Sequence, residues 1–171
     1  MLSQLENPHT VVFLGDLFKI WLAPQKFWTD LHHDTMRGFE SLRDEGSNVV
    51  FIAGNRELLL PRKLTARWKK IIPFTHLSHS DWFLNWGGKR YGFIHGDSIN
   101  YNDSQYLRWK ALTHNSIFEA FFSAIPGVLA RWIAGRIEAI LVNTNQEYKV
   151  HYPAAEIQEF AESVLPEVDQ Y

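Results

Sequence analysis

The stretch VVFLGDLFKIW, residues Val11–Trp21, decides the fold. It opens with four apolar residues, which are followed by Gly15 and Asp16. A short β-branched and aromatic run that stops at a glycine predicts a buried strand. Gly15 allows a sharp backbone turn. We therefore expect Asp16 at the carboxyl end of that strand, where open α/β sheets bind ligands and metals.

Two later segments repeat this pattern. In NVVFIAGNRE, a predicted strand at Val49–Ala53 is followed by a glycine and Asn55, and in RYGFIHGD a third strand ends just before His95. Three strands therefore end in Asp16, Asn55 and His95. Two oxygen donors and one nitrogen donor suit Mn, Fe or Zn. An ordinary turn with a hydrogen-bonded polar side chain explains any one of these residues. Turns alone do not explain three such residues in order, each beside a glycine.

The GD, GN and HGD motifs, in this order, resemble the middle three motifs of the calcineurin-like metallophosphoesterases. The usual Gly-Asn-His-Asp/Glu motif here has arginine in its third position, in Gly54-Asn55-Arg56-Glu57. This form is similar to the branch of the family that hydrolyses the pyrophosphate of UDP-2,3-diacylglucosamine in the lipid A pathway. The resemblance runs from Val11 to about Val164.

The resemblance implies an α/β fold in which mixed β-sheet layers are flanked by helices. It implies one incomplete domain over residues 1–171, with a helical insert or cap over the site at residues 101–150. It also implies a lipid-linked nucleotide substrate and two divalent metals, Mn²⁺ being the expected ion. The implied metal ligands are Asp16, Asn55 and His95, and the implied catalytic residues are Arg56 and His95.

Further polar residues are implied to contact the substrate. The full set is Asn55, Arg56, Asp103, Tyr106, Asn145 and Lys149. The guanidinium of Arg56 matches a phosphate bidentately and does not lose its proton. Asp97 is expected to orient His95 from behind.

Two motifs of the family have no counterpart here. No Asp-x-His precedes Asp16, and no Gly-His-x-His follows His95. The sequence therefore resembles the middle of a larger phosphoesterase, with an incomplete second metal site. We expect these 171 residues alone to show little or no turnover. The alternatives are another metallophosphoesterase with a different phosphoester substrate, and a non-catalytic fragment. His76, His79 and His114 are not expected to be ligands.

Between the first two strands, Lys26–Arg43 predicts an amphipathic helix that ends at Gly46, giving a βαβ unit. Its buried stripe is expected to contain Phe27, Leu31, Phe39 and Leu42. The neighbouring residues His32 and His33 do not share a helix face. Both are expected to be exposed.

Leu58–Lys70 carries five cationic residues. The preferred interpretation is a solvated helix face, and the alternative is a basic edge near an anionic substrate or membrane surface. Asp81–Trp86 and Lys89–His95 flank two glycines, which predicts a hairpin and hence a mixed sheet.

Tyr101–Asn143 is apolar and helical in pattern, with a break at Pro126-Gly127. Its large apolar residues fit core packing and equally fit an acyl-chain cleft or a membrane face. The resemblance favours the cleft. A last amphipathic helix is predicted at Pro153–Val164.

Composition limits the function classes. The chain has 171 residues, 46% of them hydrophobic, a net charge of −2 and no cysteine. This favours a globular protein without disulfides and gives no sign of bulk nucleic-acid binding. Met1–Thr10 lacks the apolar segment of a secretory signal. The sequence has no P-loop motif. We expect a cytoplasmic protein, peripheral at the inner membrane, of open oligomeric state.

Overall fold

A computed structural model describes residues 8–97, 99, 111, 116–129, 132–133, 135–136, 154–164, 166 and 168–169. Its centre is a parallel sheet of three strands in the order β1-β3-β5, formed by Thr10–Phe13, Asn48–Ile52 and His76–Ser78. Val11 pairs with Val49 and Phe13 with Phe51. This confirms the first two predicted strands and their parallel pairing. The third strand, β5, is not among the strands predicted from the sequence.

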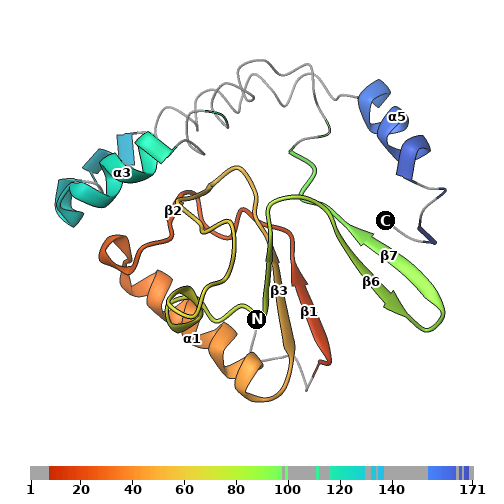
Figure 1. Cartoon of the computed structure of the whole chain (residues 1–171), viewed down its shortest axis with the longest axis horizontal. Helices are drawn as coiled ribbons and strands as arrows, with labels where there is room; N and C mark the ends of the chain where they lie inside the picture. Colours follow the sequence, from red (N-terminus) through yellow and green to blue (C-terminus); the bar gives the residue numbers. More distant parts are fainter. Residues whose placement is uncertain are drawn as a thin grey trace.

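Helix α1, Asp30–Asp44, connects β1 to β3 and covers one face of the sheet (Figure 1). The predicted start at Lys26 is wrong, because Gln25–Phe27 forms a separate 3-10 turn, η2, and Thr29 is the N-cap. The helix ends at Asp44, and Gly46 follows with φ +96°. A glycine in the left-handed region just after a helix is a common way to terminate it.

The predicted buried stripe of α1 is wrong at Leu31. Met36, Phe39 and Leu42 are buried, whereas Leu31 is 65% exposed. The inward position in the first turn belongs to His32, which lies four residues before Met36 on the same helix face. His32 is half-buried with its ring centroid 4.3 Å from that of Phe18, so the expected exposure of this histidine is also wrong.

Aromatic rings fill the space between α1 and the sheet. Phe51 of β3 stacks on Phe74 with ring centroids 4.5 Å apart, and Phe13 of β1 meets Phe39 of α1 edge-on at 4.5 Å. Offset and edge-to-face pairs of this kind add about 0.5–1.5 kcal/mol each to the area they bury. We call this cluster, which also contains the fully buried Trp21, the first core.

A second, smaller core lies beside two short strands. β2, Trp21–Leu22, pairs in parallel with β4, Glu57–Leu58. Helix α3, Ser116–Ala124, packs here through Phe122, which is 2% exposed. Lys26 secures the end of this helix, since its Nζ donates to the Ile125 carbonyl at 3.1 Å. The second core is Leu22, Phe27, Leu58, Leu59 and Phe122.

The segment after β4 is not a helix. Only Trp68–Lys70 forms a turn of 3-10 helix, η3, so the predicted helix face over Leu58–Lys70 is wrong. Proline at position 61 and the short β4 strand interrupt the segment. Leu64 and Trp68 pack against the first core, while the cationic side chains remain exposed.

The predicted hairpin is confirmed. β6, Trp82–Trp86, pairs antiparallel with β7, Lys89–Phe93. The turn residues Gly87 and Gly88 have φ +58° and +76°, values typical of a type I′ turn. Within the described part of the chain, this hairpin is a separate two-stranded sheet. The prediction of a single mixed sheet is therefore wrong, although the chain as a whole combines parallel and antiparallel pairing.

The remaining helical predictions are confirmed where the structure describes them. α3 ends at Ala124, positions 125–126 are not helical, and residues 127–129 are helical again. Helix α5, Ala154–Val164, has the predicted amphipathic stripe on its less exposed face. Among the described residues, no helix combines the length and the apolar character needed to cross a membrane.

Candidate active site

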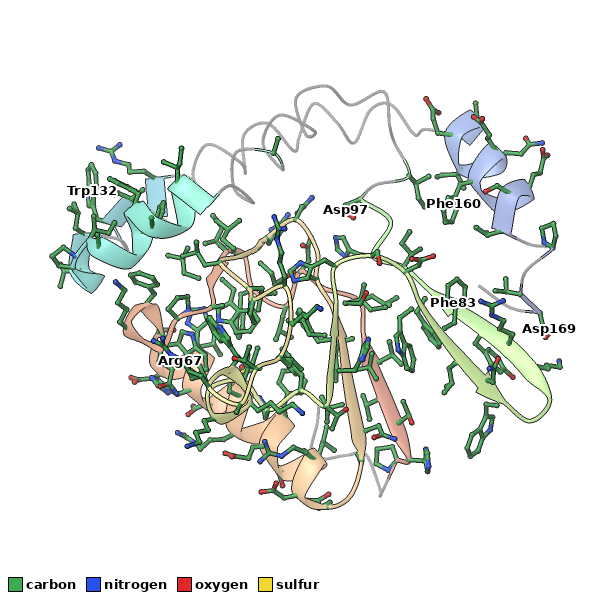
Figure 2. The ribbon with its side chains drawn as sticks, viewed as in Figure 1. Arg67, Phe83, Asp97, Trp132, Phe160 and Asp169 are labelled. Atoms are coloured by element: carbon green, nitrogen blue, oxygen red, sulfur yellow. The ribbon has the colours of Figure 1, made fainter. Side chains whose placement is uncertain are left out.

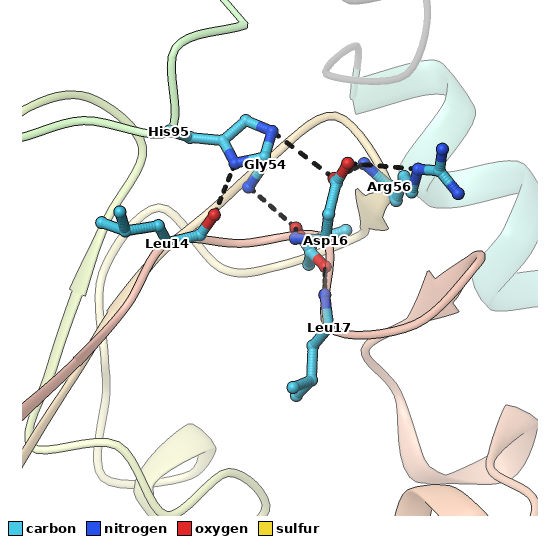
Figure 3. A network of polar contacts seen from close by, with 7 residues as sticks. Leu14, Asp16, Leu17, Gly54, Arg56 and His95 are labelled. Atoms are coloured by element: carbon cyan, nitrogen blue, oxygen red, sulfur yellow. Dashed lines mark hydrogen bonds and ion pairs between the residues drawn. The ribbon is translucent and has the colours of Figure 1, made fainter. Parts of the chain in front are cut away.

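Two loops at the carboxyl edge of the parallel sheet form the candidate site (Figure 3). The first follows β1 and carries Gly15 and Asp16. The second follows β3 and carries Gly54, Asn55 and Arg56, and the turn after β7 brings His95 to the same place. The carboxyl ends of parallel strands meet at one edge of a sheet, so residues far apart in the sequence become neighbours there.

The two loop glycines are required by close packing. Gly15 has φ +65°, and a Cβ at this position would lie 2.5 Å from the backbone nitrogen of Gly54. A Cβ on Gly54 would lie 2.6 Å from both Asp16 Oδ1 and His95 Nε2. Real Cβ atoms do not approach other atoms so closely. The glycines therefore allow the two loops, and the side chains of Asp16 and His95, to come together.

Asp16 itself has φ +51°, in the left-handed region that costs an L-residue about 1–2 kcal/mol. Its carboxylate meets three groups. Oδ2 lies 3.1 Å from Nε of Arg56, Oδ1 accepts from the Arg56 backbone N–H at 3.3 Å, and Oδ1 lies 3.5 Å from Nε2 of His95. The loop conformation thus aims the carboxylate between a guanidinium and an imidazole.

The orientation of the His95 ring is fixed from the other side. Its Nδ1 lies 2.6 Å from the carbonyl oxygen of Leu14. A carbonyl only accepts, so Nδ1 carries the hydrogen, and in the neutral ring Nε2 presents a lone pair to Asp16 Oδ1. Two acceptors facing each other at 3.5 Å attract a cation or a proton between them. A histidine whose Nδ1–H is held by a backbone carbonyl is a common arrangement for a metal ligand.

The Glu57 side chain is hydrogen-bonded to both loops. It is 2% exposed and accepts three backbone hydrogen bonds. Oε2 accepts from Asp16 N–H at 3.0 Å and from Gly54 N–H at 2.8 Å, and Oε1 accepts from Leu17 N–H at 3.0 Å. Burial raises the pKa of the Glu57 carboxyl above its usual range, and the three backbone donors oppose that rise.

Glu57 is the last residue of the Gly54-Asn55-Arg56-Glu57 motif, for which no role was predicted at this position. The sequence feature that could have indicated a role is the position of Glu57. It is an acidic residue three positions after Gly54, and it begins β4. A buried carboxylate that accepts from both loops holds Asp16 and Gly54 in register. We therefore describe Glu57 as the clamp of the site.

The other predicted site residues have different outcomes. The structure brings Asp16, Arg56 and His95 together, and Asn55 lies half-buried on the same loop as Arg56. Their roles as ligands and catalysts stay predictions, as does the role of Asp97. The predicted substrate contacts that lie outside the described residues are Asp103, Tyr106, Asn145 and Lys149. His114 also lies outside them.

Two histidines not expected to be ligands are occupied elsewhere. The His76 ring lies 5.8 Å from that of Trp82, and His79 Nε2 lies 3.0 Å from the Pro61 carbonyl. In the described part of the chain, no three histidine, aspartate or glutamate side chains lie close enough together to hold a metal ion. Among the described residues, the acidic and imidazole donors at the site are therefore Asp16 and His95, and a third donor from these residues would be an amide or a backbone oxygen.

This geometry agrees with what comparison with known proteins shows. The pattern of the calcineurin-like phosphoesterases matches residues 1–160, and the chain belongs to that family. Among individual relatives, it is similar to UDP-2,3-diacylglucosamine hydrolases. It is 28% identical over 137 residues to that of Shigella dysenteriae serotype 1 and over 138 residues to that of Enterobacter sp. strain 638. The enzyme of Escherichia coli O1:K1 is also 28% identical, over 137 residues.

Each of these alignments covers 80% of this chain and 55% of the relative. The chain thus spans about half the length of the relatives it matches. Family membership identifies it as a phosphoesterase-type hydrolase domain. The family typically binds divalent metals, and the donor chemistry at Asp16 and His95 fits one edge of such a site, because a fixed imidazole lone pair and a carboxylate oxygen face each other.

Proposed function

We propose that this chain contributes to metal-dependent hydrolysis of the pyrophosphate bond of UDP-2,3-diacylglucosamine, giving 2,3-diacylglucosamine 1-phosphate and UMP in lipid A biosynthesis. The observation that carries the proposal is the position of the Asp16 carboxylate between His95 Nε2 and Arg56 Nε. That arrangement places two donors for a cation beside a guanidinium that matches a phosphate.

Asp16, Asn55 and His95 would hold divalent metal, with Mn²⁺ as the proposed ion. Bound divalent metal supplies an acidified water and neutralises charge on the phosphoryl oxygens. The protein's own part is to fix the geometry. Leu14 holds the imidazole tautomer, and the Glu57 clamp holds the Asp16 loop.

Arg56 has a separate proposed role. Its Nε already pairs with Asp16 Oδ2, and its side chain is 31% exposed, so part of the guanidinium faces solvent. A planar guanidinium remains charged at any working pH and binds phosphate through parallel N–H bonds. A family histidine in this position could move a proton, whereas arginine cannot. That difference suits a substrate whose leaving group is a phosphate.

The lipid part of the substrate requires an apolar surface. Phe122 anchors α3 to the second core, which leaves the opposite face of the helix and the residues after it uncovered. Trp132 is 60% exposed and lies near α3 (Figure 2). We propose that this face meets the acyl chains or the inner-membrane surface, which makes the protein cytoplasmic and peripheral. Its exposed apolar residues are Ile117, Phe121, Val128, Leu129 and Trp132.

The test is binding of the lipid-linked nucleotide rather than its turnover, because we expect little or no turnover from these 171 residues alone. UDP-2,3-diacylglucosamine in detergent micelles would be titrated into the chain with excess Mn²⁺. We expect saturable binding that weakens about tenfold in Arg56→Ala, the usual effect of losing one charge-assisted contact. The matched control is Arg62→Ala, which removes an exposed arginine from a different segment.

The dependence of affinity on the acyl chains distinguishes the proposed lipid-linked substrate from other phosphoesters. A UDP-sugar without acyl chains should bind more weakly than the diacylated substrate. Equal affinity for the two would reject the lipid-linked substrate and favour another phosphoesterase reaction at the same site. Robust turnover with two metals bound per chain would show instead that residues outside Asp16, Asn55 and His95 supply ligands.

A further inference from the structure

A cavity of about 120 Å³ lies between α1 and the segment that carries η3. It is lined on one side by residues along α1 and just before it, including Arg37 and Arg43, and on the other by residues 69–73. None of its lining residues belongs to the candidate active site around Asp16 and His95, so the cavity is separate from that site.

Positive charge dominates the rim of this cavity. Four lining side chains are cationic, those of Arg37, Arg43, Lys69 and Lys70, and one is anionic, that of Glu40. The excess has a source in the sequence, because residues 61–80 include five lysines and arginines and no acidic residue. In a chain with a net charge of −2, this is a local concentration of one sign.

The two sides of the rim differ in how their charge is balanced. Arg37 pairs with Asp34, and Arg43 donates to Glu40 at 3.2 Å and to Asp44 at 2.9 Å. Lys69 and Lys70 are exposed and form no ion pair with any residue that the structure describes. The uncompensated charge at the cavity therefore comes from consecutive lysines held on one turn.

The floor of the cavity gives that turn a rigid base. Trp28, Met36 and Ile72 line it and are 8%, 4% and 0% exposed. Ile72 also anchors the chain immediately after Lys70, since its N–H donates to the Trp68 carbonyl at 2.9 Å. Figure 2 shows Arg67, from the same segment, well away from Asp97, which lies two residues after His95.

We propose that this cavity binds a compact phosphate-class oxyanion, with Lys69 and Lys70 as its main charge partners. The reasons are uncompensated ammonium groups, a preformed hollow of suitable size and a packed apolar floor that excludes water from one side. Charge-assisted hydrogen bonds to such an anion strengthen where one face of the site is dry. Isolated surface lysines would lack the hollow and the floor.

The test uses the whole chain in EDTA, so that no metal recruits the anion to the Asp16 site. Inorganic phosphate and pyrophosphate would be titrated by calorimetry, and the melting temperature recorded at each concentration. We expect one site per chain and a melting temperature that rises with ligand, as binding to the folded state requires. The Lys69→Ala, Lys70→Ala double variant should bind at least about tenfold more weakly.

A matched control variant makes the result specific. The Arg62→Ala, Lys63→Ala double variant removes the same charge from the same basic segment but outside the cavity. This control should bind within about twofold of wild type. Equal weakening of the two lysine-containing double variants would show diffuse attraction and overturn the proposal.

Other results would also overturn the proposal. Unchanged binding in the Lys69→Ala, Lys70→Ala variant would place the anion outside the cavity. No binding of either anion by the wild-type chain at millimolar concentration would reject the cavity site. Neither outcome would bear on the hydrolase proposal, which depends on the lipid-linked nucleotide and on Mn²⁺.

Discussion

Replacing the Glu57 clamp by glutamine should loosen both loops of the candidate site. The carboxylate accepts three backbone N–H groups, two at Oε2 and one at Oε1. Glutamine has nearly the same shape but one acceptor oxygen. With that oxygen in the place of Oε2, the new NH₂ group would face the Leu17 N–H, and two donors would oppose each other in a buried position.

The magnitude follows from counting bonds. A hydrogen bond to a charged group contributes about 1.5–3 kcal/mol and a neutral one about 0.5–1.5 kcal/mol. Glu57→Gln removes one charged bond and converts two others to neutral ones. Burial, which raises the pKa of Glu57, offsets part of this loss, because a neutral amide costs less to bury than a carboxylate. If this offset cancels the two conversions, the free energy of unfolding should fall by about 2 kcal/mol, the contribution of the one charged bond that is lost.

The assay is equilibrium urea denaturation at neutral pH, with Mn²⁺ affinity measured on the same variants. Glu40→Gln is the matched control, because Glu40 is an exposed acidic residue in a surface ion pair with Arg43. It should change stability by less than about 0.5 kcal/mol. If Glu57→Gln were as stable as Glu40→Gln and bound Mn²⁺ equally well, the clamp interpretation would be refuted.

Three further changes test the fold around the site. Gly54→Ala should weaken Mn²⁺ binding by more than about tenfold, since its Cβ would lie 2.6 Å from Asp16 Oδ1; Gly135→Ala, with open space around it, should not. Phe122→Ala should cost about 3 kcal/mol in urea denaturation and expose α3 to hydrogen exchange, whereas Phe121→Ala, at a 53% exposed position, should have little effect. His32→Gln should reduce the decrease in the free energy of unfolding as pH falls, as measured by denaturation between pH 5 and 8.

The sign of the His32 effect follows from its environment. Nδ1 of His32 accepts from the Thr29 N–H at 3.0 Å, which caps α1 and needs an unprotonated nitrogen. Burial is the main cause that lowers the pKa of His32 below its ordinary value of 6.5, and His33 adds to it. The unfolded chain therefore binds more protons below pH 6.5, so stability is lost as pH falls. Glutamine keeps an acceptor oxygen for the cap but does not titrate. An equally steep acid loss in the variant would exclude this histidine as the cause.

The sequence predicted the parts of the fold that are set by local pattern. β1 and β3 are continuous apolar runs that end at glycines, and the β6–β7 turn has two glycines that adopt positive φ. The same strand-end pattern placed Asp16 and His95 at one edge. These signals are short-range, so a single sequence carries them.

What the sequence did not predict depends on tertiary contacts. β2 and β4 are two residues long and exist because they pair with each other across 36 residues. The burial of His32 in place of Leu31 depends on the phase of a helix that starts at Asp30, and that start is set by Thr29. The role of Glu57 depends on three backbone donors that only the folded loops bring together.

The central claim is that Asp16 binds metal while the neighbouring Arg56 binds phosphate. Mn²⁺ affinity of the wild-type chain, Asp16→Ala and Arg56→Ala, measured by calorimetry or electron paramagnetic resonance, tests it most directly. Asp16→Ala should bind Mn²⁺ at least about tenfold more weakly, since the carboxylate is the anionic donor of the site. Arg56→Ala should bind Mn²⁺ as well as wild type or better, because the guanidinium competes for Oδ2 at 3.1 Å. Equal loss of Mn²⁺ in both variants, or no loss in Asp16→Ala, would contradict the account.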